Sequence, residues 1–206
     1  KAVAMFRSPL NGELGESHAG GRLALAMRYA GYDALVIHGR AARPTYLYVD
    51  SEQVLLKRAD AVWGLDAEEA GRVLRDLEPG RGHRSIMRIG PAGERLVRYA
   101  LVNCETYRHF GRLGLGAVFG SKLLKGIYIS GDCDFRIPDV RGYNRVYTEI
   151  YERIVKTDAM QKYHDLGTPS NVMPLHELGA LPTRNLQAVR FEARRRSVAR
   201  PLPSTT

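Results

Sequence analysis

The sequence predicts an α+β fold, in which β-strands and short helices form a first domain and a helical segment follows. Two observations support this. A glycine-rich loop, a short helix, a glycine and an apolar strand follow one another at residues 17–39, and the same order of parts returns at residues 111–131. After Gly131 the strand pattern gives way to amphipathic helical spacing, so we place a domain boundary near Asp132. The repeat indicates two similar halves, with a coincidence of common elements as the alternative.

The first sixty residues alternate apolar runs with glycine- and proline-containing breaks. Gly31 is a natural stop for a short amphipathic helix. The predicted elements are a strand at 1–7, a turn at 8–12, a glycine-rich loop at 15–21, a helix at 23–30, a buried strand at 34–37, a half-exposed strand at 45–49 and a strand at 54–57.

The middle of the chain begins with a capping box, in which Asp66 stands at the N-cap and Glu69 three residues later. It predicts a helix that Pro79 and Gly80 end. Strands are predicted at 85–89 and 96–102, joined by a loop at 90–94.

Beyond the boundary, Pro138 and Asp139 begin a predicted amphipathic helix that ends near Gly167. Loops follow at 167–171 and 179–185. From residue 193 the chain is basic and then rich in Pro, Ser and Thr, so we expect disorder there. The predicted domains are therefore residues 1–131, 132–192 and a tail at 193–206.

The glycine-rich segment Gly111-Arg112-Leu113-Gly114-Leu115-Gly116 is a candidate anion site. Glycines allow close approach of the backbone, and a helix start offers free N–H groups to a phosphate. A tight turn packed on a sheet is the alternative. His18 and His109 each lie in or beside a glycine loop, and the guanidinium forks of Arg108 and Arg112 suit phosphate. Two such loops in one domain suggest one ligand with two phosphates.

Composition narrows the function class. The net charge is +9, but aromatic residues do not alternate with basic ones as an RNA-binding sheet requires, so nucleic acid is disfavoured. No run approaches the roughly 18 apolar residues of a membrane span. Cys104 and Cys133 are too few for a cluster or zinc site, and we expect free thiols in or near the core, in a reducing, cytoplasmic compartment. No catalytic motif is present.

Several motifs together resemble the N-terminal region of the aldehyde ferredoxin oxidoreductase family, whose members carry tungsten or molybdenum on a bis-pterin cofactor. In order, they are Ser8-Pro9-Leu10-Asn11-Gly12, Glu16-Ser17-His18-Ala19-Gly20-Gly21, Ala30-Gly31-Tyr32-Asp33, Pro44-Thr45-Tyr46-Leu47-Tyr48, Trp63-Gly64, Ile89-Gly90-Pro91-Ala92-Gly93-Glu94, the segment 108–125 and the segment 179–185. The resemblance implies two mostly antiparallel β-sheets related by a pseudo-twofold axis, forming a base for the two pterins.

The resemblance also implies residue roles. Backbone carbonyls at the positions of His18 and His109 would hold a magnesium ion between the pterin phosphates. Arg108 matches a pterin-contacting arginine, and Lys1 stands where an arginine is expected, without its bidentate fork. The expected cofactor-binding residues are Lys1, His18, Ala19, Gly20, Gly21, Arg108, His109, Gly111, Arg112, Gly114 and Gly116.

As implied by the resemblance, the whole enzyme would oxidise aldehydes to carboxylic acids and pass electrons to ferredoxin. The 4Fe-4S cluster and its ligands would belong to the remaining domains or to a split subunit. A homo-oligomer is also compatible with the resemblance. The first domain is expected to be N-terminally incomplete, since the first residue is Lys1. Two alternatives are a non-catalytic remnant or isolated fragment with no activity alone, and a nucleotide-binding α/β module with a parallel sheet.

Overall fold

The computed structural model describes residues 1–78, 80–134, 136–165 and 167–191. The chain divides into two compact units, the first covering residues 1–135 and the second beginning at residue 136. The tail predicted at 193–206 lies outside the described residues. Among the described residues, no helix combines the length and apolar character that crossing a bilayer requires.

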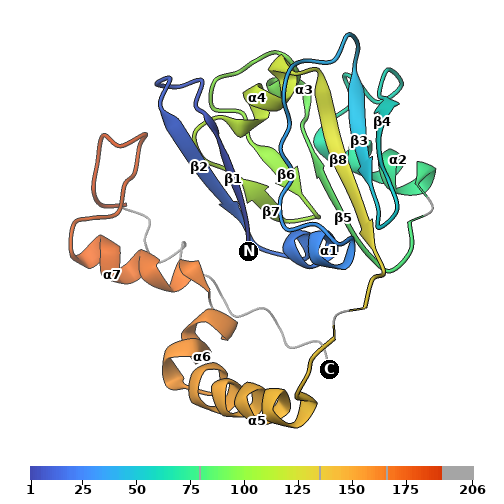
Figure 1. Cartoon of the computed structure of the whole chain (residues 1–206). Helices are drawn as coiled ribbons and strands as arrows, with labels where there is room; N and C mark the ends of the chain where they lie inside the picture. The colour runs from blue at the N-terminus through green and yellow to red at the C-terminus, as the bar shows by residue number, and fades with distance from the viewer. Residues whose placement is uncertain (79, 135, 166, 192–206) are drawn as a thin grey trace. The chain divides into compact units, whose positions relative to one another are not determined.

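The first unit is built on a six-stranded mixed sheet (Figure 1). Its strand order is β4-β3-β8-β5-β6-β7, and β3–β8 is the one parallel pair in this sheet. The mostly antiparallel pairing confirms the α+β class and differs from the parallel sheet of a nucleotide-binding module. The strands are β3 (Thr45–Val49), β4 (Val54–Arg58), β5 (His83–Arg88), β6 (Val102–Cys104), β7 (Arg108–Phe110) and β8 (Leu124–Gly131).

A second, two-stranded sheet is the antiparallel hairpin of β1 (Ala2–Arg7) and β2 (Leu14–Ala19). Its residues alternate between a buried and an exposed face, as period-2 side chains require. Ala2 pairs with Ala19, which brings Lys1 to the end of β2. The turn predicted at 8–12 joins the two strands, and most of the loop predicted at 15–21 is strand.

Helices cover the six-stranded sheet from two sides (Figure 1). Leu47, Val49, Ile127 and Ile129 face the core that includes α1 and α4, whereas Tyr46, Tyr48 and Tyr128 face the core that includes α2. Both faces of β8 are therefore buried, and this strand is the centre of the first unit. The helices are α1 (Leu23–Tyr29), α2 (Ala67–Leu77), α3 (Pro91–Glu94) and α4 (Leu115–Ser121).

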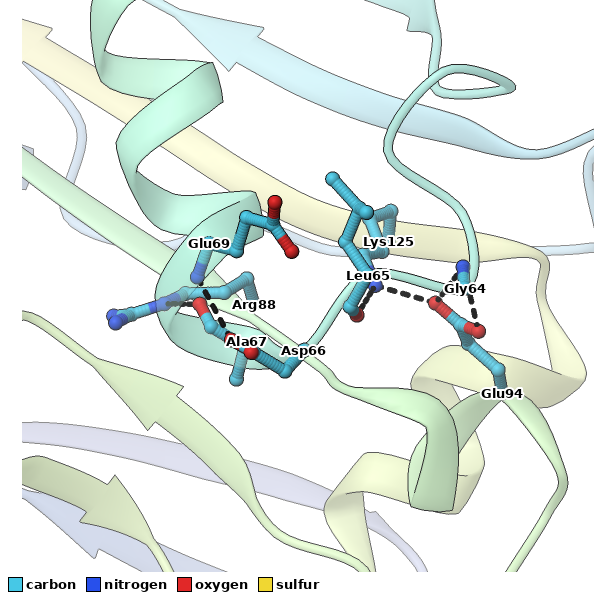
Figure 2. Close-up of polar contacts among 8 residues, drawn as sticks. All are labelled: Gly64, Leu65, Asp66, Ala67, Glu69, Arg88, Glu94 and Lys125. Carbon is cyan, nitrogen blue, oxygen red and sulfur yellow. Dashed lines mark hydrogen bonds and ion pairs between the residues drawn. The ribbon is translucent and has the colours of Figure 1, made fainter.

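Buried charges fasten α2 and α3 to the sheet, as Figure 2 shows. Lys125 on β8 is fully buried, donates to the carbonyl of Leu65 at 2.8 Å and pairs with Glu94 at the end of α3. Glu94 in turn accepts from the amide of Gly64 at 2.9 and 3.0 Å. Arg88 on β5 donates to the carbonyl of Ala67 at 2.7 Å, in the first turn of α2.

The N-cap half of the predicted capping box is present: the Asp66 carboxylate accepts a hydrogen bond from the Glu69 amide at 2.8 Å. The hydrogen bonds that the Asp66 carboxylate accepts from the backbone amides of Glu69 and Glu68 hold its pKa below the usual value.

Several predicted elements differ. Residues 34–37 form no strand and Val36 is 77% exposed, because an apolar run becomes a strand only with a partner and no described strand pairs with it. The second copy of the repeat gives α4 and β8, so the first copy lacks its strand. Of the strand predicted at 96–102 only Val102 is a strand residue, and 96–101 are turns and irregular backbone. The predicted loop 90–94 holds α3, and β3 is buried along its whole length rather than half-exposed.

The second unit is helical. The single predicted helix is interrupted: α5 (Val140–Ile150) runs into a π-helical turn, Tyr151–Val155, and α6 (Asp158–Asp165) follows. A 3₁₀ turn, Thr168–Asn171, occupies the loop predicted at 167–171 and leads into α7 (Val172–Glu177). After α7, an isolated antiparallel β-bridge joins Thr183 and Ala188.

Candidate functional site

The two glycine-containing segments meet along one seam, although 95 residues separate Ser17 from Arg112. The amide of Arg112 donates to the buried Ser17 hydroxyl at 3.2 Å. At the other end of the contact, a Cβ built on Gly21 would lie 3.1 Å from Cγ of Arg108. The two segments therefore run side by side in opposite directions. We call residues 17–22 and 105–112 the glycine seam.

Gly21 is required at its position for two reasons. Its φ of +84° lies in the left-handed region, and any side chain would press on the stem of Arg108 and on Glu105, whose Cγ would be 3.4 Å away. Gly20 also faces Arg108, with 3.8 Å from its built Cβ to Nε of the arginine. These glycines let the main chain of the first segment approach a guanidinium of the second.

Basic groups gather at the seam. The side chains of Arg108, His109 and Arg112 are exposed, and among the described residues they have no hydrogen-bond or ion-pair partner. Lys1 lies beside the end of β2 by the register of the hairpin. Free guanidinium and ammonium groups beside exposed backbone are suited to an anion with several oxygen atoms.

The other predicted residues occupy distinct positions. His18 lies on β2 opposite Val3, with its ring 3.3 Å from the Glu16 carboxylate, and His109 lies on β7 opposite Asn103. Ala19 is buried, and Gly111 has open space around a built Cβ.

Gly114 and Gly116 pack against other backbone instead. A Cβ on Gly114 would lie 2.0 Å from the carbonyl oxygen of Arg98, and one on Gly116 would lie 2.4 Å from that of Leu101. The Gly116 amide already donates to the Ala100 carbonyl at 2.8 Å. The start of α4 is thus used for packing, which narrows the candidate anion seat to the seam itself.

Two seam residues escaped the prediction. Arg22 follows Gly21 directly, and its guanidinium forms an ion pair with the Glu105 carboxylate at 3.3 Å. The side chain of Glu105 is only 8% exposed. Together with Gly21, Thr106, Tyr107 and Arg108 they line a pocket of about 310 Å³. The available signal was a charged residue beside each glycine segment, but sequence spacing does not reveal that the two charges pair.

A larger, mostly apolar cavity of about 1130 Å³ lies between β1, α1 and α4. Lys1 is the one predicted site residue on its lining, together with Met27, Leu35, Phe119 and Ile127 among others. Most of this lining is apolar, but it also carries charged side chains, among them Arg7, Asp33, Arg98 and Lys122.

The cysteines are separate free thiols. Cys104 is buried next to Glu105, and burial raises the pKa of its thiol to about 11. Cys133 is exposed, contrary to the expected place in or near the core. Within the described ranges, His, Cys, Asp and Glu side chains form no group of three or more that could hold a metal ion.

Comparison with known proteins gives consistent matches. Residues 1–131 match the family model "Aldehyde ferredoxin oxidoreductase, N-terminal domain". The chain is 38% identical to the tungsten-containing aldehyde ferredoxin oxidoreductase of Pyrococcus abyssi, over 92% of this chain and 31% of the relative. It is 27% identical to the aliphatic sulfonate oxidoreductase, WOR-like subunit, of Pyrococcus furiosus, over 91% of this chain and 32% of the relative.

Among solved structures, the chain is similar to the active site complex BamBC of benzoyl coenzyme A reductase in complex with 1,5 dienoyl-CoA. The TM-score is 0.68 at 28% identity, over 74% of this chain and 23% of the other. The chain spans about a third of the length of the curated relatives it matches. With the family model matched across the whole first domain, the chain belongs to the aldehyde ferredoxin oxidoreductase family.

Proposed function

We propose that the glycine seam seats the phosphate groups of a tungsten- or molybdenum-pterin cofactor. The chain would be the cofactor-binding portion of an oxidoreductase that oxidises aldehydes to carboxylic acids with ferredoxin as electron acceptor. The names of the curated relatives support tungsten and the reaction. The single observation that carries the proposal is the contact of two distant glycine segments at Gly21 and Arg108.

The residues present fit such a group. Gly20 and Gly21 leave no side chain between the main chain and Arg108, and Arg108 and Arg112 supply unpaired guanidinium forks for phosphate oxygens. Lys1 adds a point charge at the same end of the hairpin. Main-chain carbonyls of His18 and His109, on the two strands that meet at the seam, are the proposed magnesium ligands.

When bound, the cofactor would supply the two-electron chemistry of the oxidation. The part of this chain is to bind and orient the phosphate ends and to neutralise their charge. Cys104 is buried with a raised pKa, and two cysteines are too few for a 4Fe-4S cluster, so we assign cluster and ferredoxin contacts to the remaining domains or a partner subunit.

The test is metal analysis and pterin fluorescence on the complete assembly, in wild type and in Gly21→Ala. Wild type should contain tungsten or molybdenum and pterin, and Gly21→Ala should lose most of both. Gly31→Ala is a matched control, because its φ of +83° gives the same strain but nothing lies within 4 Å of the built Cβ. Wild type without pterin would favour the non-catalytic remnant. Equal losses of metal and pterin in Gly21→Ala and Gly31→Ala would mean that Gly21 matters only for folding.

A further inference from the structure

We propose that the pocket of about 310 Å³ beside Gly21 binds one phosphate group between two guanidiniums, those of Arg22 and Arg108. This rests on the proposed function and assigns the site a residue, Arg22, that neither the motifs nor the spacing single out. The six residues on the lining come from both sides of the seam, so occupation of the pocket joins the two glycine segments through one ligand.

Arg22 retains free donors. Its side chain is 64% exposed, and Nη2 alone contacts Glu105, at 3.3 Å. Among the described residues, Nε and Nη1 of Arg22 have no partner, and Arg108 has none at all. A guanidinium can use one edge for a carboxylate and the other for a phosphate, because its five N–H donors lie in a fixed plane.

Glu105 holds Arg22 in place. Its side chain is nearly buried, accepts a hydrogen bond from the Ser85 hydroxyl, and its backbone carbonyl accepts from the buried Arg88. Its φ of +58° is rare for a residue other than glycine, and such a conformation persists where the surroundings fix it. One oxygen of the Glu105 carboxylate accepts from Ser85 and the other pairs with Arg22, and the Glu105 side chain is nearly buried, so the exposed charge of the pocket is that of the two arginines.

The charge and the size of the pocket select the ligand. Two guanidiniums against one carboxylate leave a net positive pocket, which favours an anion. A volume of about 310 Å³ is at the lower end of small-molecule sites, which span roughly 300–1,000 Å³. It suits one phosphate group with its first waters and is too small for a complete bis-pterin.

The test is isothermal titration of the full 206-residue chain with inorganic phosphate at low ionic strength. Arg22→Gln should raise the Kd roughly 10- to 100-fold, the loss expected for a hydrogen bond between charged groups. Arg108→Gln should do the same, and Arg22→Lys should give an intermediate Kd because it keeps the charge without the fork. Thermal unfolding of each variant checks that it is folded. If Arg22→Gln does not fold, the comparison is made with Arg22→Lys.

The matched control is Arg72→Gln on α2. Arg72 is 71% exposed, close to the 64% of Arg22, and it pairs with an exposed carboxylate, Glu68, on α2 rather than with a residue of the seam. The Kd of Arg72→Gln for inorganic phosphate should stay within twofold of the wild-type value. Equal effects of Arg72→Gln and Arg22→Gln would mean general electrostatics and overturn the proposal. If Arg108→Gln loses phosphate binding but Arg22→Gln keeps it, this inference is overturned and the proposed phosphate seat stands. No phosphate binding by wild type overturns both this inference and the proposed seat.

Discussion

Replacing Lys125 by methionine should destabilise the first unit severely. The Lys125 side chain is 0% exposed and its ion-pair partner Glu94 is 6% exposed, so the pair sits in the interior between β8 and α3. Methionine keeps much of the aliphatic stem but leaves the Glu94 carboxylate without a counter-charge and the Leu65 carbonyl without its 2.8 Å donor. Glu94 would keep the amide of Gly64, at 2.9 and 3.0 Å (Figure 2).

The expected loss is about 3–5 kcal/mol, the range measured when one partner of a buried pair is removed. That is a large share of the roughly 5–15 kcal/mol of a typical domain. In the double variant Lys125→Met/Glu94→Gln no unpaired charge remains, so we expect it to be more stable than Lys125→Met alone.

Urea unfolding followed by tryptophan fluorescence is the assay, because Trp63 is the only tryptophan and precedes Gly64 of this network. Arg72→Met removes an exposed ion pair and should change the midpoint little. A loss below about 1 kcal/mol in Lys125→Met, or a double variant as unstable as the two single losses added together, would refute the reasoning.

Three further predictions follow from the thiols and the α2 cap. Cys133 should react with a thiol reagent in the native protein at pH 8, while Cys104, with its pKa raised to about 11, should react roughly 100-fold more slowly or only on unfolding; equal rates would contradict its burial. Because the folded pKa of Cys104 lies above its unfolded value of 9.0, its contribution to stability should be complete below pH 9 and lost as the pH rises toward 11, so the wild-type Tm should fall there more than that of Cys104→Ala. Asp66→Ala should lower the Tm, and the difference from wild type should shrink as the pH falls below 3.8, because the folded pKa of Asp66 is depressed; a pH-independent difference would argue against the carboxylate cap.

Local chemistry explains what the sequence predicts well. The Asp66 cap and the buried strand β8 each follow from neighbouring residues, and both are found. The repeat of a glycine loop predicts two phosphate seats that share one ligand, and that shared ligand stays a prediction. In the structure, Gly20 and Gly21 lie directly against the Arg108 side chain.

Features that depend on distant partners could not be predicted. Residues 34–37 have the composition of a strand, but they pair with none of the described strands. Gly114 and Gly116 belong to a phosphate-like motif, yet they serve the close approach of residues 98–101. The Arg22–Glu105 pair joins residues 83 positions apart, and neither residue belongs to a recognisable motif.

The central claim is that both glycine segments grip the same phosphorylated ligand. The most direct measurement is a two-dimensional amide NMR titration of the chain with inorganic pyrophosphate, following Gly20 and Gly21 on one segment and Gly111 and Arg112 on the other. The account predicts that all four amides shift along one binding curve with a single Kd. Shifts in one segment only, or two curves with different midpoints, would contradict it.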